Sequence, residues 1–216
     1  MAFDAYDDYE QGELVQKWLR QNGLSIVVGI AIGLVAIFGW QQWRSHQAAN
    51  QAAAADLYQQ LQTALASGKQ TQADQLIDQL QKDYGKSSYA VFAVSEQAQR
   101  DVQSKQLDKA LASLAWAEGH AQNPALKSLT QLRIAQVQLA AGKTNDALAT
   151  LDRMQAKGYE ALAQELRGDA LVKLGRTDDA RKAYQAAMAV LGDDAPQRGA
   201  LQVKLDDLAV AGKQGA

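Results

Sequence analysis

The pattern of apolar and polar positions divides the chain into an uncharged N-terminal stretch and a longer region with helical periodicity. Residues 21–43 carry no charged side chain, and their central part, residues 24–40, is mostly apolar. With its uncharged flanks, this stretch reaches the length of about 20 residues that crosses a bilayer. Trp18 precedes it and Trp40 and Trp43 lie at its end, as in the aromatic belts of membrane interfaces. We therefore predict a transmembrane helix over residues 21–43.

Two other interpretations of this stretch are a buried core helix and a cleaved signal peptide. A core helix of this length would show a polar stripe, and the stretch has none. A signal peptide would begin with a basic segment and end at a small-residue cleavage site directly behind the apolar run. Here residues 1–20 are net acidic, and the small-residue run at residues 53–55 lies well beyond Trp40. We therefore expect an uncleaved signal anchor.

The basic residues on either side of the span predict its orientation. Lys17 and Arg20 precede it and Arg44 follows it, and loops rich in Lys and Arg stay in the cytoplasm. This two-to-one bias places the N-terminus inside and the rest of the chain on the other side of the membrane. Residues 1–20 are then a cytoplasmic acidic tail and a short amphipathic helix.

The span also contains a pair of small residues with helical spacing. Gly29 and Gly33 form a small-xxx-small pattern, which lets another membrane helix approach closely. We predict that these two glycines contribute to membrane-helix packing, either with a second copy of the chain or with a different membrane protein.

Behind the span, residues 44–67 consist of strong helix formers and predict a helical stalk that becomes the first helix of a folded domain. Residues 68–194 then contain four similar turns, each followed by a helix with apolar positions at i, i+3, i+4 and i+7. The alanines that end these turns are 37, 37 and 33 residues apart: Ala73, Ala110, Ala147 and Ala180. A two-helix repeat of about 34 residues is typical of tetratricopeptide proteins.

We therefore predict an all-α fold in which a single N-terminal transmembrane helix precedes a tetratricopeptide-like α-solenoid of helix pairs. We expect residues 195–216 to form a C-terminal capping helix and tail, on which Arg198, Lys204, Asp206 and Asp207 supply a polar outer face. In the last repeat, Gly168 lets the two helices approach and Tyr184 fills the gap beside it. Thr144 and Thr177 are the expected N-caps of two helices.

Composition narrows the range of functions. The formal net charge is -2, and the five acidic and two basic residues of the first 20 positions leave the remainder nearly neutral. A nucleic-acid-binding protein would show a basic face, so we exclude that class. The chain has no cysteine, and His46 and His120 belong to no cluster with metal-ligand spacing. Because phosphate loops, nucleophile elbows and dinucleotide fingerprints are also missing from the sequence, we expect no enzyme activity, cofactor, metal or small-molecule substrate.

Protein binding is the function that the repeats favour. The first helices of successive repeats line a concave surface in such solenoids, and their mixed polar and apolar residues can hold an extended peptide or a partner's helix. Six residues are the candidates for this groove, with Ser95, Leu132 and Lys173 beside them: Phe92, Gln99, Arg133, Gln136, Glu165 and Asp169.

Each of these candidates could instead be ordinary solvated surface or part of the packing between helices. Arg133 is the most informative one, because it is a lone cation on an otherwise apolar helix. An internal ion pair with Glu165 or Asp169 is the alternative explanation for this arginine.

Several segments together resemble one known family. They are Gly39–Gln47, Leu132–Ala135, Gly158–Tyr159, Leu166–Leu171 and Ala180–Tyr184. In this combination the chain resembles the YfgM family, whose members are ancillary subunits of the bacterial SecYEG translocon. The resemblance implies an inner-membrane protein with a periplasmic repeat domain, which works beside a membrane-anchored periplasmic chaperone of the PpiD type and receives or protects newly translocated chains.

The prediction is thus a non-enzymatic, single-pass inner-membrane adaptor of the Sec translocon. Its expected partners are SecYEG, a PpiD-type chaperone, nascent secreted or membrane proteins and the lipid bilayer, without nucleic acid. Two alternatives stay open. One is a structural assembly factor of another envelope or division complex, and the other is a scaffold that faces the cytoplasm.

Overall fold

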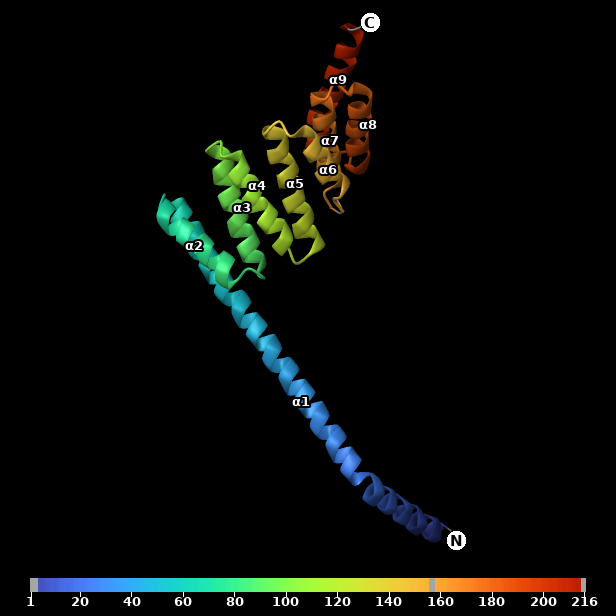
Figure 1. Cartoon of the computed structure of the whole chain (residues 1–216). Coiled ribbons are helices and arrows are strands. Elements are labelled where there is room, and N and C mark those ends of the chain that lie inside the picture. The colour runs from blue at the N-terminus through green and yellow to red at the C-terminus, as the bar shows by residue number, and fades with distance from the viewer. Residues whose placement is uncertain (1–3, 156–157, 215–216) are drawn as a thin grey trace. The chain divides into compact units, whose positions relative to one another are not determined.

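The computed structural model describes residues 4–155 and 158–214, and within these ranges the regular structure consists of nine α-helices and no strand (Figure 1). This confirms the all-α prediction. Residues 1–3 of the predicted acidic tail and residues 215–216 of the predicted C-terminal tail lie outside the described residues. The helices are α1 (Asp4–Ala66), α2 (Gln70–Asp83), α3 (Ser88–Gln103), α4 (Leu107–His120), α5 (Pro124–Ala140), α6 (Thr144–Asp152), α7 (Glu160–Lys173), α8 (Thr177–Val190) and α9 (Gln197–Gln214).

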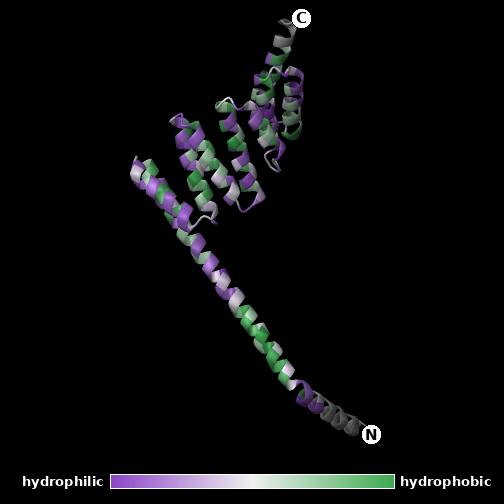
Figure 2. Cartoon of the chain, viewed as in Figure 1, coloured by the Kyte–Doolittle hydropathy of each residue, from purple (hydrophilic) through white to green (hydrophobic). Residues whose placement is uncertain are grey.

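Tertiary contacts divide the chain into two units, residues 1–50 and residues 51–216. In the first unit, the uncharged stretch at residues 21–43 is helical and forms one continuous hydrophobic segment of α1 (Figure 2). Its large apolar side chains are exposed, including Val35 and Phe38 at 74% and 72%. Exposure of so much apolar surface to water is unfavourable, at about 25 cal/mol per Å², so this segment requires lipid or a partner around it. Among the described residues it is the one helix that could cross a membrane, as the sequence predicts.

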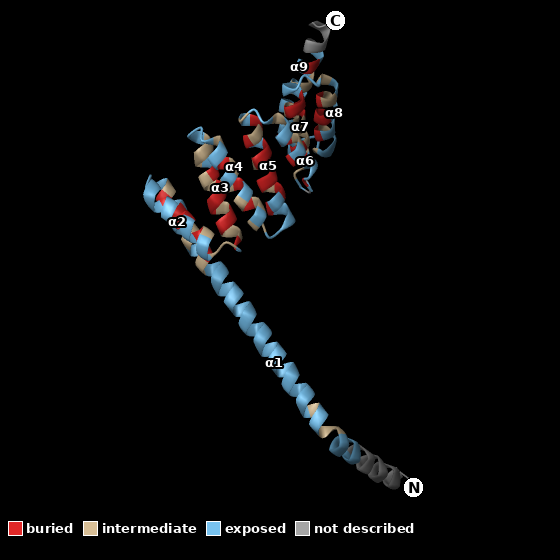
Figure 3. Ribbon diagram, in the orientation of Figure 1, coloured by how far each residue is buried: buried red, intermediate tan, exposed pale blue. Residues whose placement is uncertain are grey.

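The second unit is built from successive helix pairs that share four hydrophobic clusters. The first cluster joins the end of α1 to α2 and α3 through fully buried residues such as Leu61, Ile77 and Val91. The other three clusters follow along the chain to α9. The buried positions of α3 and α5 appear as red stretches of these helices in Figure 3. The finer division of the chain into five segments stays a prediction.

Helix α5 takes part in three of these clusters. It contributes Leu126 to the first, Ile134 and Val137 to the fourth, and Leu132 and its neighbours to the second. Its start follows the sequence expectation, because Pro124 occupies the first turn and the Asn123 side chain accepts the backbone N–H of Leu126 at 2.8 Å.

The four repeated turns have one backbone geometry. In each, the second residue donates its N–H to the carbonyl five residues before it, as in Lys69 N to Ala64 O at 2.9 Å and Gln106 N to Asp101 O at 2.8 Å. This bond belongs to the Schellman motif, which needs a positive φ at the preceding residue. Glycine supplies it in three turns, and Lys105 adopts a φ of 58° in the other.

The predicted N-caps of α6 and α8 are wrong by one residue. Both helices begin at the threonines themselves, and their N-caps are Lys143 and Arg176, whose side chains make no capping hydrogen bond. The tight turn is the reason. The Lys143 carbonyl accepts the N–H of Ala147, which is the first hydrogen bond of α6, so Thr144 is already a helical residue. The aspartates of the first turn stay near the positive end of the helix dipole, as expected.

The packing of the last repeat follows the sequence prediction. A Cβ atom added to Gly168 in α7 would overlap the ring of Tyr184 in α8. Only glycine therefore allows these two helices to approach as closely as they do, with the tyrosine ring lying over the α7 backbone.

Two basic side chains of the capping helix α9 point toward the repeats, whereas the sequence predicts that they point outward. Arg198 donates to the carbonyls of Met188 at 2.9 Å and Leu191 at 3.1 Å, and Lys204 contacts carboxylates of α7. These two cations therefore attach α9 to the repeats and do not form its outer face. The attraction between a cation and the carbonyl end of α8 explains the position of Arg198.

Candidate protein-binding groove

A groove lies between α3 and α5, the first helices of two successive repeats. Its volume is about 240 Å³, and we call it the α3–α5 groove. It is lined by Ser95, Ala98, Gln99, Val102, Leu114, Arg133, Gln136, Val137 and Ala140. The structure therefore brings three of the six predicted groove residues together, namely Gln99, Arg133 and Gln136, with Ser95 next to them.

Apolar side chains form most of the groove, and polar side chains border it. Leu114, which comes from α4, is only 2% exposed, and Val137 is almost as deeply buried. Gln99 from α3 and Gln136 from α5 are both exposed. The hydroxyl of Ser95 donates to the Val91 carbonyl at 2.7 Å, so its one donor is already used within α3. The groove thus combines an apolar interior with two amide groups that make no hydrogen bond to another described side chain.

Arg133 supplies the cationic side chain of this lining and is half-buried. Within residues 16–155 and 158–209, no carboxylate pairs with it and no hydrogen bond engages its guanidinium. The internal partners suggested by the sequence are occupied elsewhere, because Glu165 and Asp169 both pair with Lys204. The ion-pair explanation for Arg133 therefore does not hold for these two carboxylates.

An aromatic cluster lies near Arg133. Tyr58 of α1 and Tyr89 and Phe92 of α3 have ring centroids 5.7 to 6.4 Å apart. Burial and the charge of Glu96 raise the pKa of the Tyr58 hydroxyl, and a hydrogen bond with the Gln62 side chain and the charge of Arg133 oppose them. Phe92, a predicted groove residue, belongs to this cluster and packs against the first hydrophobic core.

The remaining two predicted residues belong to a different site. Lys204 of α9 lies 2.8 Å from Glu165 and 2.7 Å from Asp169, and the Tyr184 hydroxyl donates to Asp169 at 2.7 Å. Burial, and then the hydrogen bond to Asp169, raise the pKa of the Tyr184 hydroxyl far above its ordinary value. Burial by itself lowers the pKa of Lys204, but the hydrogen bonds and charges of Asp169 and Glu165 outweigh it and raise the pKa overall. We call these four residues the Lys204 cluster.

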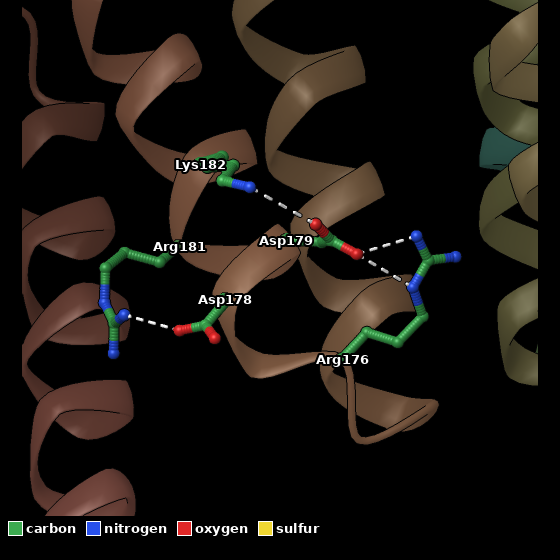
Figure 4. A network of polar contacts seen from close by, with 5 residues as sticks. All are labelled: Arg176, Asp178, Asp179, Arg181 and Lys182. Carbon is green, nitrogen blue, oxygen red and sulfur yellow. Dashed lines mark hydrogen bonds and ion pairs between the residues drawn. The ribbon is translucent and has the colours of Figure 1, made fainter.

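The carboxylates at the start of α8 also have nearby cations. Arg176 donates twice to Asp179, at 2.7 and 3.0 Å, and Arg181 donates to Asp178 at 2.9 Å (Figure 4). Lys182 lies 3.7 Å from Asp179. The hydrogen bond and charge of Arg176 lower the pKa of the Asp179 carboxyl. These exposed ion pairs stabilise the first turns of the helix and carry no sign of acid–base chemistry.

Sequence reasoning missed two contributors to this region. Leu114 reaches the groove from the second helix of its repeat, and Tyr58 reaches the aromatic cluster from α1. Helical spacing marks both as apolar positions of their own helices but does not show which neighbouring helix they meet. Gly29 and Gly33 are exposed and have no neighbour within 4 Å of an added Cβ atom, so their role in packing stays a prediction.

An exposed apolar helix followed by helix pairs with a concave groove defines a membrane-anchored protein of the tetratricopeptide class. The comparison with protein families agrees, because residues 16–210 match the tetratricopeptide repeat-like domain. The chain is 31% identical over 208 residues to the ancillary SecYEG translocon subunit of Escherichia coli (strain K12), covering 94% of this chain and 98% of that protein. It therefore belongs to the family of ancillary SecYEG translocon subunits, which confirms the resemblance to YfgM.

Two further relatives have the same description. The ancillary SecYEG translocon subunit of Haemophilus influenzae (strain ATCC 51907 / DSM 11121 / KW20 / Rd) is 29% identical over 187 residues, covering 87% of this chain and 91% of that protein. The subunit of Aggregatibacter actinomycetemcomitans is 31% identical over 206 residues, covering 94% of this chain and all of that protein, at 100%. The similarity thus includes both the anchor and the repeats.

Proposed function

We propose that this chain is a non-enzymatic adaptor of the SecYEG translocon in the bacterial inner membrane. The N-terminal helix anchors it in the bilayer, and the repeat domain binds a PpiD-type periplasmic chaperone or newly translocated proteins. The relatives, which are ancillary subunits of the SecYEG translocon, support the association with the translocon. The observation that carries the binding role is the α3–α5 groove, an apolar cleft with free amides between the first helices of two repeats.

The proposed orientation has the N-terminus in the cytoplasm and the repeats in the periplasm. Its support is the distribution of Lys17 and Arg20 before the span and Arg44 after it. Because the chain has no cysteine, an Ala216→Cys variant carries a single thiol. We expect a membrane-impermeant maleimide to label this thiol in cells whose outer membrane has been opened. Labelling only after the inner membrane is lysed would reverse the orientation.

Quantitative co-purification from inner membranes in mild detergent tests the association with the translocon. The native chain is compared with a variant in which an unrelated apolar span replaces residues 24–40. If the native chain recovers SecYEG and the variant loses it, the anchor specifies docking. If both recover SecYEG, docking belongs to the repeat domain. Failure of both chains would reject the proposal and favour an assembly factor of another envelope complex.

A second experiment tests the role of the groove. Ala140 is an exposed residue at its edge, so Ala140→Trp places a large ring across the cleft without disturbing the core. We expect this variant to lose photo-crosslinks to arrested translocating chains or to the chaperone, with SecYEG recovery unchanged. Ala186→Trp, at an exposed position of α8 outside the groove lining, is the matched control. Equal crosslinking of both variants would remove the groove from the proposal.

A further inference from the structure

The size of the α3–α5 groove limits what it can hold. Its volume of about 240 Å³ is below the range of about 300–1,000 Å³ that accommodates drug-sized ligands. Apolar side chains such as Leu114 and Val137 form most of its interior. The cleft therefore suits one or two apolar side chains of a longer molecule whose backbone continues outside it.

The two amides at the edge indicate the conformation of that molecule. Gln99 and Gln136 come from different helices, and each carries both donors and an acceptor. The backbone of an extended peptide has unpaired N–H and C=O groups that these amides can satisfy. A bound helix has already paired its own backbone groups and would gain nothing from them. The lining therefore favours an extended segment over a helix.

Arg133 indicates the charge of the segment. This half-buried guanidinium has no carboxylate partner among the described residues, and Glu118, on the neighbouring helix α4, is already engaged by Gln131 and Arg153. The charges of Glu96 and Arg133 both act on the Tyr58 hydroxyl, but Glu96 makes no ion pair with the arginine. A partly desolvated guanidinium gains most from a carboxylate, which it binds through two parallel hydrogen bonds.

We infer that the α3–α5 groove binds an extended, internal peptide segment that inserts an apolar side chain beside Leu114 and presents an aspartate or glutamate side chain to Arg133. A C-terminal carboxylate is a poorer fit, because its capture uses unpaired backbone N–H groups. All lining residues lie inside α3, α4 or α5, where these groups bond within the helix. This inference rests on the proposed protein-binding function and names the kind of segment that the groove selects.

The test measures peptide affinity with the full chain in nanodiscs of phosphatidylcholine, which avoids detergent in the groove. The probe is a fluorescent peptide with both ends capped and the sequence Gly-Ser-Leu-Val-Asp-Leu-Val-Ser-Gly. Two matched probes carry Asn or Lys in place of the Asp. We expect the Asp probe to bind about 10-fold more tightly than the Asn probe, because a hydrogen bond to a charged group contributes about 1.5 kcal/mol or more.

Variants of Arg133 then connect this preference to one side chain. Arg133→Gln should bring the Asp and Asn probes within about 2-fold of each other, and Arg133→Glu should prefer the Lys probe. Arg133→Lys, which keeps the charge but loses the planar fork, should show an intermediate preference and serves if the other variants fold poorly. Lys127→Gln is the matched control, since it removes an exposed cation from the same helix outside the groove.

Three results would overturn the inference. They are equal affinity of the native chain for the Asp and Asn probes, a preference for Asp that survives Arg133→Gln, and failure of every probe to bind. None of them rejects the proposed function, because recovery of SecYEG with the native chain is measured separately. Loss of that recovery, with the Asp preference intact, would reject the translocon association and leave the groove chemistry standing.

Discussion

The α3–α5 groove and the α7 region of the repeat domain both carry charged residues on the first helices of their repeats, but they use these charges differently. At the α3–α5 groove, Arg133 lies beside an apolar cleft and has no carboxylate partner within residues 16–155 and 158–209. At α7, Glu165 and Asp169 both form ion pairs with Lys204 from the capping helix. In the alignment of the repeats, Glu165 and Asp169 occupy the positions of Leu132 and Gln136, on either side of Arg133, so position alone does not distinguish a binding residue from a structural one. What distinguishes them is whether another side chain of the fold supplies the opposite charge.

The strongest test of the C-terminal end is the contact between α7 and α8. Gly168→Leu should lower the free energy of unfolding by about 3 kcal/mol, because its Cβ atom collides with the Tyr184 ring and pushes the helices apart. Thermal unfolding followed by circular dichroism measures the effect. Gly199→Leu is the control, since nothing lies within 4 Å of an added Cβ at that position, and equal stability losses in both variants would reject the explanation.

Removing the two cations one at a time tests the comparison directly. Lys204→Met leaves Glu165 and Asp169 without their cation, and we expect a loss of about 1–2 kcal/mol of stability. Breaking a fully buried ion pair costs about 3–5 kcal/mol, and the loss here is smaller because water still reaches these groups. Arg133→Met has no ion pair to break and should change stability by less than about 0.5 kcal/mol. Equal losses of stability in the two variants would show that Arg133 is as much a structural residue as Lys204.

Alkaline pH tests the Lys204 cluster in another way. The folded state raises the pKa of both Tyr184 and Lys204, so above about pH 10 the unfolded chain binds fewer protons than the folded chain. Their contribution is therefore fully present below that pH and falls as pH rises through the folded-state pKa values. We expect the midpoint of urea unfolding to fall as pH rises above about 10, and to fall less steeply in Tyr184→Phe. A slope that Tyr184→Phe leaves unchanged would contradict this assignment.

The smallest effect concerns the turn between α3 and α4. Lys105 takes the positive φ that glycine supplies in the other turns, and such a conformation costs about 1 kcal/mol for a residue with a Cβ atom. Lys105→Gly should therefore raise stability by about 1 kcal/mol or slightly less, measured by urea unfolding. Gly142→Lys, the reverse change in the next repeat, should lower it by a similar amount. Destabilisation by Lys105→Gly would show that the lysine side chain has a separate role.

The sequence predicts which face each helix presents, but it does not show which residues meet across helices. Spacing within α3 and α5 was enough to place Gln99, Arg133 and Gln136 in one groove. It assigned Glu165 and Asp169 to the same surface because nothing in the sequence connects them to Lys204, which lies 39 residues after Glu165 and 35 residues after Asp169. The position of Thr144 was missed because a tight turn and a helix start share their backbone groups. Long-range partners and the residues at which a helix begins or ends depend on tertiary structure.

The position of α5 in three hydrophobic clusters has a consequence for how the domain opens. This helix forms one wall of the α3–α5 groove and packs against neighbours on both sides along the chain. Releasing it would expose Leu126, Ile134 and Leu132 in three clusters at once, so partial unfolding at either end should stop before it reaches α5. The groove therefore lies on the last part of the domain to lose its structure, and fraying of the outer helices leaves its shape in place.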